Sequence, residues 1–109
     1  SNYILSGSDN DTILDAGQTN VVLAGSGDDI VFSLGKSNNI LAQSGDDIVI
    51  GLGESNRVSG GDGDDVLLAG GKSNIFLGGA GDDIIVGIGQ NNTISGDRGD
   101  DWIIAGGSN

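Results

Sequence analysis

Short apolar stretches recur about every nine residues along this chain, and each is centred on a large apolar residue. Period-2 alternation around mostly β-branched centres predicts very short strands, and glycine every few residues excludes helices. One set of centres follows an acidic string, and the other follows an asparagine. The first set is Ile13, Val31, Val49, Leu67, Ile85 and Ile103, and the second is Ile4, Val22, Ile40, Val58, Phe76 and Ile94. We expect these twelve side chains to form the core.

The two sets of strands belong to one 18-residue repeat. Gly-Asp-Asp occurs at 27–29, 45–47, 63–65, 81–83 and 99–101, and Asp-Asn-Asp at 9–11 holds the same phase. A second string, Gly-x-Ser/Thr/Asn-Asn, opens at Gly17, Gly35, Gly53, Gly71 and Gly89. Six copies of 18 residues fill 108 of the 109 residues.

This repeat predicts one all-β domain over residues 1–109, a right-handed parallel β-roll (β-solenoid) of six coils with two short strands each. We expect successive coils to stack about 4.8 Å apart. The predicted coils are approximately 1–16, 17–34, 35–52, 53–70, 71–88 and 89–106.

Composition narrows the function classes. Gly accounts for 22 of 109 residues, about three times its usual share. Cys and His are absent, which excludes disulfides and thiolate or imidazole metal sites. Acidic residues outnumber basic ones 16 to 4, for a net charge of −12, which argues against nucleic acid or an anionic membrane surface as a partner. No apolar run approaches the roughly 20 residues of a membrane span, so we predict no membrane insertion.

Residues 78–86, Gly-Gly-Ala-Gly-Asp-Asp-Ile-Ile-Val, match the nine-residue pattern G-G-x-G-x-D-x-U-x at every position. The chain therefore resembles the RTX (repeats-in-toxin) calcium-binding β-roll across all six copies. The resemblance implies that Ca²⁺ is the cofactor and that each ion lies in the turn between two successive coils. It implies these side-chain ligands: Asp11, Asp29, Asp47, Asp65, Asp83 and Asp101. The turn backbone would supply further oxygens, at Gly25, Gly27, Gly45, Gly61, Gly63, Gly79, Gly81 and Gly99.

Elementary chemistry agrees with this resemblance. Ca²⁺ takes six to eight oxygen ligands and tolerates irregular geometry. Stacked carboxylates about 5 Å apart repel one another unless a cation lies among them. Six coils would hold at most about five ions along one edge. The alternative is that Gly-Asp-Asp is only favourable turn chemistry, but that explains one Asp per turn and not two acidic residues in five copies.

Some copies depart from the pattern. Asp9, Gln43 and Asp97 replace turn glycines, and Arg98 brings a positive charge beside the last turn. We therefore expect the sites around Asp65 and Asp83 to be the most secure.

The other edge of the roll carries asparagine where the first carries aspartate. The equivalent residues are Asn2, Asn20, Asn38, Asn56, Asn74 and Asn92. Neutral amides do not compensate a divalent ion, but they can donate and accept along the stack. We expect an asparagine ladder here, with weak calcium binding as the alternative.

Outward positions on the Gly-Asp-Asp side form two columns. These are Thr12, Ile30, Ile48, Val66, Ile84 and Trp102, and Leu14, Phe32, Ile50, Leu68, Val86 and Ile104. Eleven of the twelve are large and apolar, which predicts face-to-face association with a second copy; plain strand propensity is the alternative. The roll also lacks evident caps. Head-to-tail assembly and a segment cut from a longer array both stay open.

These features predict a calcium-binding structural protein rather than an enzyme. The acidic pairs all lie in repeated turns, and we see no unique His, Cys or out-of-phase acid. We expect a secreted or cell-surface location, where calcium is abundant, and a role as a building block of an extracellular filament or surface layer. The alternative, which the resemblance implies, is a calcium-folded segment of a larger secreted toxin, exoenzyme or adhesin.

We predict that calcium binding and folding are one event, because the core is one side chain thick and carboxylate repulsion opposes the metal-free fold. Adding Ca²⁺ to the calcium-free monomer should produce β-structure by circular dichroism together with a change in Trp102 fluorescence. Full β-structure before any calcium is added would contradict this prediction.

Overall fold

The computed structural model describes residues 1–108, and within that range every regular element is a strand. The twelve strands are β1 (Tyr3–Ser8), β2 (Thr12–Asp15), β3 (Val21–Ser26), β4 (Ile30–Lys36), β5 (Asn39–Ser44), β6 (Ile48–Glu54), β7 (Arg57–Asp62), β8 (Val66–Lys72), β9 (Ile75–Ala80), β10 (Ile84–Gln90), β11 (Thr93–Arg98) and β12 (Trp102–Ser108). No helix in this range is long and apolar enough to cross a membrane.

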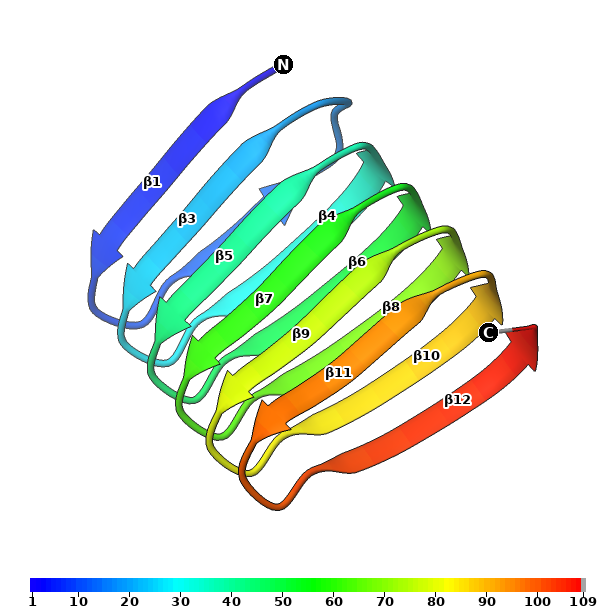
Figure 1. Ribbon diagram of the computed structural model, residues 1–109. Helices are drawn as coiled ribbons and strands as arrows, with labels where there is room; N and C mark the ends of the chain where they lie inside the picture. The colour runs from blue at the N-terminus through cyan, green and yellow to red at the C-terminus, as the bar shows by residue number, and fades with distance from the viewer. Residues whose placement is uncertain (109) are drawn as a thin grey trace.

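The strands alternate between two parallel six-stranded sheets, which we call the odd sheet (β1-β3-β5-β7-β9-β11) and the even sheet (β2-β4-β6-β8-β10-β12). Figure 1 shows the odd strands in front, the even strands behind, and the chain winding between them in a right-handed sense. Every strand pairs with the equivalent strand one coil away at a constant offset of 18 residues, as in Ile40↔Val58 and Val49↔Leu67. The predicted β-solenoid is therefore confirmed.

The roll is a thin slab, with principal extents of 36 × 33 × 15 Å. Its strands are longer than the three-residue apolar stretches suggested, because pairing continues into the glycine-containing segments. β4, for example, is seven residues long and ends at Lys36.

A single layer of side chains fills the space between the sheets. The fully or almost fully buried apolar residues are Ile13, Val22, Ala24, Val31, Ile40, Ala42, Val49, Val58, Leu67, Ala69, Phe76 and Ile85. The two sheets interdigitate: a Cβ placed on Gly51 would lie 3.4 Å from the ring of Phe76 and 3.5 Å from Val58. Small residues in one sheet thus leave room for large ones in the other.

The predicted core is confirmed for nine of the twelve centres, and Ile4 and Ile94 pack against it while only partly buried. Ile103 is different, because its side chain is 44% exposed. It lies on β12, which ends the even sheet and pairs only with β10 among the described strands. A core one side chain thick leaves its last rung uncovered.

Left-handed backbone closes the turns. The second glycine of the G-G-x-G-x-D turn, such as Gly61, has a positive φ. A Cβ on Gly61 would lie 2.7 Å from the carbonyl carbon of Gln43 one coil earlier, so the close stacking also favours glycine there. Gln43 and Asp97 adopt this conformation without being glycine, with φ of 88° and 74°. Asp9 does so at another turn position, with φ of 95°. These are the departures noted in the sequence, and each places a side chain where the repeat favours glycine.

Candidate metal centre

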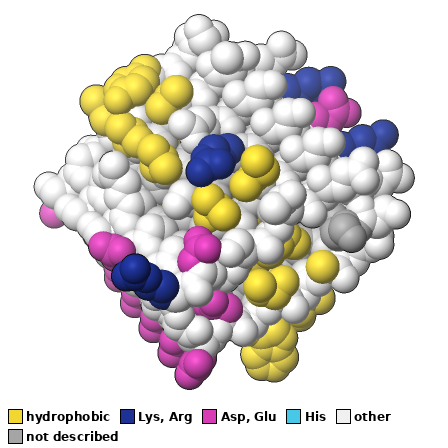
Figure 2. Space-filling view, viewed as in Figure 1, with side chains coloured by type: hydrophobic (Ala, Val, Ile, Leu, Met, Phe, Trp, Pro, Cys, Tyr) yellow, Lys and Arg dark blue, Asp and Glu magenta, His cyan; other side chains and the backbone are white. Residues whose placement is uncertain are grey.

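The turns form two edges of different chemistry. The acidic edge comprises the turns 9–11, 27–29, 45–47, 63–65, 81–83 and 99–101, which lead from odd to even strands. Figure 2 shows acidic side chains in a row along this edge, at the lower left. The asparagine edge lies at the opposite ends of the strands, where even strands lead into odd ones.

The predicted ligand aspartates form an inner column at the acidic edge. The described members Asp29, Asp47, Asp65 and Asp83 are almost completely buried, and Asp11 and Asp101 are half-buried. After Asp11, each Oδ1 accepts a hydrogen bond from the backbone N–H of the equivalent aspartate one coil earlier. The Asp47 N–H donates to Asp65 Oδ1 at 2.8 Å, and the Asp65 N–H donates to Asp83 Oδ1 at 2.8 Å. The inner carboxylates therefore form part of the backbone scaffold of the turns.

The residue before each inner aspartate forms an exposed outer column, to which sequence reasoning gave no role; it is Asn10 in the first turn and aspartate in the other five. Here the backbone N–H bonds to the preceding coil, as when the Asp64 N–H donates to Asp46 Oδ1 at 2.9 Å. The same contact links Asp82 to Asp64 and Asp100 to Asp82. Inner and outer columns thus bond in opposite directions. The repetition of two acidic residues per turn was the sequence signal for this double ladder.

The second oxygen of the inner carboxylates has a different environment. Within residues 1–108, the Oδ2 atoms of Asp11, Asp29, Asp47, Asp65 and Asp83 are buried without a hydrogen-bond partner. A buried carboxylate oxygen without a donor is unfavourable unless a cation or a proton compensates it.

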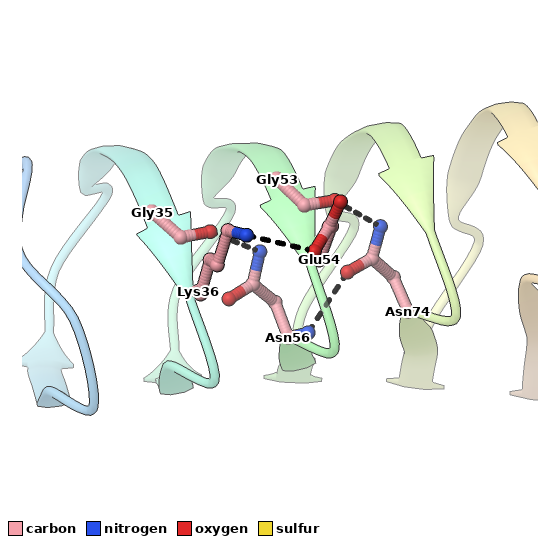
Figure 3. Close-up of polar contacts among 6 residues, drawn as sticks. All are labelled: Gly35, Lys36, Gly53, Glu54, Asn56 and Asn74. Carbon is pink, nitrogen blue, oxygen red and sulfur yellow. Dashed lines mark hydrogen bonds and ion pairs between the residues drawn. The ribbon is translucent and has the colours of Figure 1, made fainter.

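The asparagine edge shows what the same backbone does with an amide. The Asn56 N–H donates to Asn74 Oδ1 at 2.8 Å, which repeats the inner-column bond of the acidic edge. The second side-chain atom is now a donor: Asn56 Nδ2 bonds Gly35 O at 3.2 Å, and Asn74 Nδ2 bonds Gly53 O at 3.1 Å (Figure 3). The predicted asparagine ladder is confirmed. At the asparagine edge, the carbonyls of Gly35 and Gly53 therefore accept hydrogen bonds from side-chain amides. At the acidic edge, the equivalent side-chain atom is a carboxylate oxygen, which cannot donate.

Glycine makes room for the aspartate carboxylate in the later coils. A Cβ on Gly60 would lie 2.8 Å from the carboxyl carbon of Asp65 and 2.7 Å from Gly78 O. A Cβ on Gly78 would lie 2.9 Å from the carboxyl carbon of Asp83 and 2.7 Å from Gly96 O. A carboxylate and a carbonyl of the next coil therefore approach the same small space. Sequence reasoning did not single out these glycines.

The donor set fits Ca²⁺ better than a transition metal. No three acidic side chains converge anywhere in the described chain, so a cation here would need carbonyl oxygens in addition to the inner carboxylates. Ca²⁺ accepts such mixed carboxylate and carbonyl ligands. The eight turn glycines predicted as backbone ligands all lie at this edge, with φ between 111° and 133°. Their carbonyls as ligands stay a prediction.

Burial changes the acidity of the inner column. Burial raises the pKa of Asp65 to about 7, reinforced by the charges of Asp47, Asp83 and Asp46 and opposed by the hydrogen bond from the Asp47 N–H. Burial is also the main reason why the pKa values of Asp47 and Asp83 are raised. Without a metal ion, the inner carboxylates therefore bind a proton more readily than an exposed aspartate does.

One ion pair on the asparagine edge joins neighbouring coils. Lys36 Nζ lies 3.0 Å from Glu54 Oε2 (Figure 3), and this contact lowers the pKa of the exposed Glu54 carboxyl. Exposed pairs of this kind contribute little to stability.

Asp15 corrects the expectation that no acid lies out of phase. Its side chain is buried, and Oδ1 accepts bonds from Asn20 Nδ2 at 2.5 Å and from the Gly17 N–H at 3.2 Å. The same repeat position elsewhere is small, as at Ser33 and Gly51. Asp15 therefore bonds to the first coils of the asparagine ladder, and aligning the copies would have revealed it.

Comparison with protein families identifies the repeat. The family model for the RTX calcium-binding nonapeptide repeat (4 copies) matches residues 1–31, 24–58, 32–67, 41–76, 59–87 and 86–109, which together span the chain. The chain belongs to this family of calcium-binding β-rolls. Comparisons with curated proteins and with solved structures returned no match.

The raised pKa of Asp65 predicts how the metal-free fold responds to pH. The unfolded chain ionises this carboxyl near its ordinary pKa of 3.8, and the folded chain only near 7. The contribution of protonated Asp65 to stability is therefore fully present below about pH 4 and is lost as pH rises through about 7. With a chelator present, the folded fraction measured by circular dichroism should fall between these pH values.

Asp65→Asn provides the control for this experiment, because it keeps the Oδ1 acceptor and removes the titrating group. Its folded fraction should depend less on pH. A wild-type folded fraction that rises from pH 4 to 7 without calcium would contradict the prediction.

Proposed function

We propose that this β-roll is a structural module that folds as Ca²⁺ ions bind along its acidic edge. The row of buried Oδ2 atoms without donors is the observation that carries the proposal. One such oxygen recurs in successive coils, beside the small space that a carbonyl of the next coil also approaches. Five ions would change the net charge from −12 to about −2 and remove most of the repulsion along the edge.

A structural role is favoured over an enzymatic one by what the acidic residues do. Both acidic columns bond to the turn backbone of neighbouring coils. Their regular hydrogen bonding in the turns supports a role in folding for both columns, and we propose no catalytic group among them.

Asp65→Asn tests the ion site directly. Asn keeps the oxygen that accepts the Asp47 N–H but loses the charge and replaces the second oxygen with a donor. Equilibrium dialysis should show about one Ca²⁺ fewer per chain, with folding shifted to higher calcium concentration. Asp64→Asn is the matched control, since it makes the same charge change in the exposed outer column. Equal ion losses in both variants, or none in Asp65→Asn, would contradict the proposal.

We further propose that the outer surface of the even sheet associates with the same surface of a second copy. The two predicted columns are joined by a third, formed by Leu34, Leu52 and Ile88, because the even strands are longer than expected. Exposed members include Ile30, Ile48, Val66 and Ile84. A flat apolar face of this kind is favourable when buried. A second copy offers an equally flat face and keeps both acidic edges at the rim.

The double variant Ile48→Lys/Ile84→Lys tests this face, because it places four charges in each paired interface. Sedimentation velocity in calcium should show assembly for the wild type and monomer for the variant. Ser59→Lys/Thr93→Lys is the matched control, with the same charge change on the outer surface of the odd sheet. A wild type that stays monomeric in calcium would contradict association.

Calcium dependence suits a place outside the cell. We propose a secreted or cell-surface building block of a filament or surface layer, in which the apolar face joins copies in pairs and a second contact would extend the pairs. The alternative is a calcium-folded segment of a larger secreted toxin, exoenzyme or adhesin, which the repeat family favours. Calcium-dependent filaments seen by electron microscopy would support the first role.

A further inference from the structure

One repeat position at the acidic edge differs between the first three coils, which we call early, and the last three, which we call late. It lies five residues before each inner aspartate and points into the roll. The residues there are Ser6, Ala24, Ala42, Gly60, Gly78 and Gly96. Ala24 and Ala42 are fully buried and belong to the apolar core. The early coils therefore carry a side chain where the later coils carry only a hydrogen.

The asparagine edge shows that this position touches the second side-chain atom of the ladder residue. Asn38 Nδ2 donates to Ser33 Oγ at 3.1 Å, and Asn20 Nδ2 donates to Asp15 Oδ1 at 2.5 Å. Ser33 and Asp15 hold the equivalent position, five residues before each asparagine. The residue at this position therefore determines which group contacts the second side-chain atom of the ladder residue.

The late coils leave that space to oxygen atoms. Around Gly60, the place of a Cβ is taken by the Asp65 carboxylate and by Gly78 O, the latter 2.7 Å from it. Around Gly78 it is taken by the Asp83 carboxylate and by Gly96 O. A real Cβ does not approach heavy atoms this closely, so a methyl group here would separate the carboxylate from the carbonyl.

The early coils contain that methyl group. The register pairs Leu41 with Ser59 and Gln43 with Gly61, which sets Ala42 beside Gly60 of the next coil. The Ala42 methyl therefore occupies the region through which Asp47 Oδ2 and Gly60 O would share an ion. The ladder bond from the Asp29 N–H to Asp47 Oδ1 is unaffected, at 2.8 Å. Ala42 therefore leaves the hydrogen bonds between the turns intact and changes only the space available to an ion beside Asp47.

We propose that Ala24 and Ala42 weaken calcium binding in the early coils, so that the tight ions are those of Asp65 and Asp83. This inference rests on the proposed calcium function and narrows its number of ions. The roll then has a late segment held by calcium and an early segment in which alanine methyl groups extend the apolar core. A metal ion that loses contact with one ligand of its shell should bind about tenfold more weakly or worse.

Calcium titration calorimetry on the full chain, with equilibrium dialysis for the count, tests the inference. The wild type should show a tight class of ions separated from a weaker class by about tenfold or more in affinity. Ala42→Gly should move about one ion into the tight class, and Ala24→Gly should do the same. Gly78→Ala should remove about one ion from the tight class.

Ala69→Gly is the matched control, because Ala69 is buried at the same repeat position of the asparagine edge. Ala69→Gly replaces the same methyl group by hydrogen, but far from the acidic column. It should therefore leave the number of tightly bound calcium ions unchanged. If Gly78→Ala fails to fold, the two alanine-to-glycine variants still decide the question.

The outcomes separate this inference from the function on which it rests. A wild type with about five equivalent tight ions, or Ala42→Gly and Ala24→Gly variants that both bind as the wild type does, would overturn the role of the alanines and leave the calcium function intact. A wild type that binds no calcium would overturn the proposed function itself.

Discussion

The buried carboxylate in each acidic turn is the constraint on which the rest of this structure depends. Parallel stacking with an 18-residue offset places equivalent residues in columns, so one buried aspartate becomes a row of them. One oxygen of each carboxylate satisfies a backbone N–H of the neighbouring coil, and the other has no donor within residues 1–108. The same side chain therefore holds the turns together and makes them depend on a proton or a cation.

The two edges show how little separates a metal-dependent turn from an independent one. Asn56 and Asp65 make the same bond from side-chain oxygen to backbone N–H. They differ in the second atom, which is a donor to Gly35 O in Asn56 and a lone oxygen in Asp65. An amide completes the hydrogen bonding within the protein, whereas a carboxylate requires a positive partner. The asparagine ladder thus needs no cation, although Asp15 beside it also has a buried Oδ2 without a donor in the described chain, and the acidic edge responds to its surroundings.

The thin core explains the remaining features. With one layer of side chains between the sheets, each large residue needs a small one opposite, as Phe76 needs Gly51. The same thinness exposes Ile103 on the last described rung and turns many β-branched residues outward. Strand alternation turns every second residue of the even strands outward, and most of these residues are apolar in this sequence.

The sequence alone determined the solenoid, its coil length, nine buried centres and the asparagine ladder, because an 18-residue period allows only one register. It also placed aspartates in the turns of the repeat that the calcium-binding family model matches. Only the tertiary structure decided that the inner and outer aspartates bond in opposite directions, that Asp15 is buried beside Asn20, and that Ile103 is exposed. The physical reason is that periodicity specifies which residues stack. The hydrogen-bond partner of each polar atom depends on the neighbouring coil. It also depends on whether a methyl group, as in Ala42, or only a hydrogen, as in Gly60, lies beside that atom.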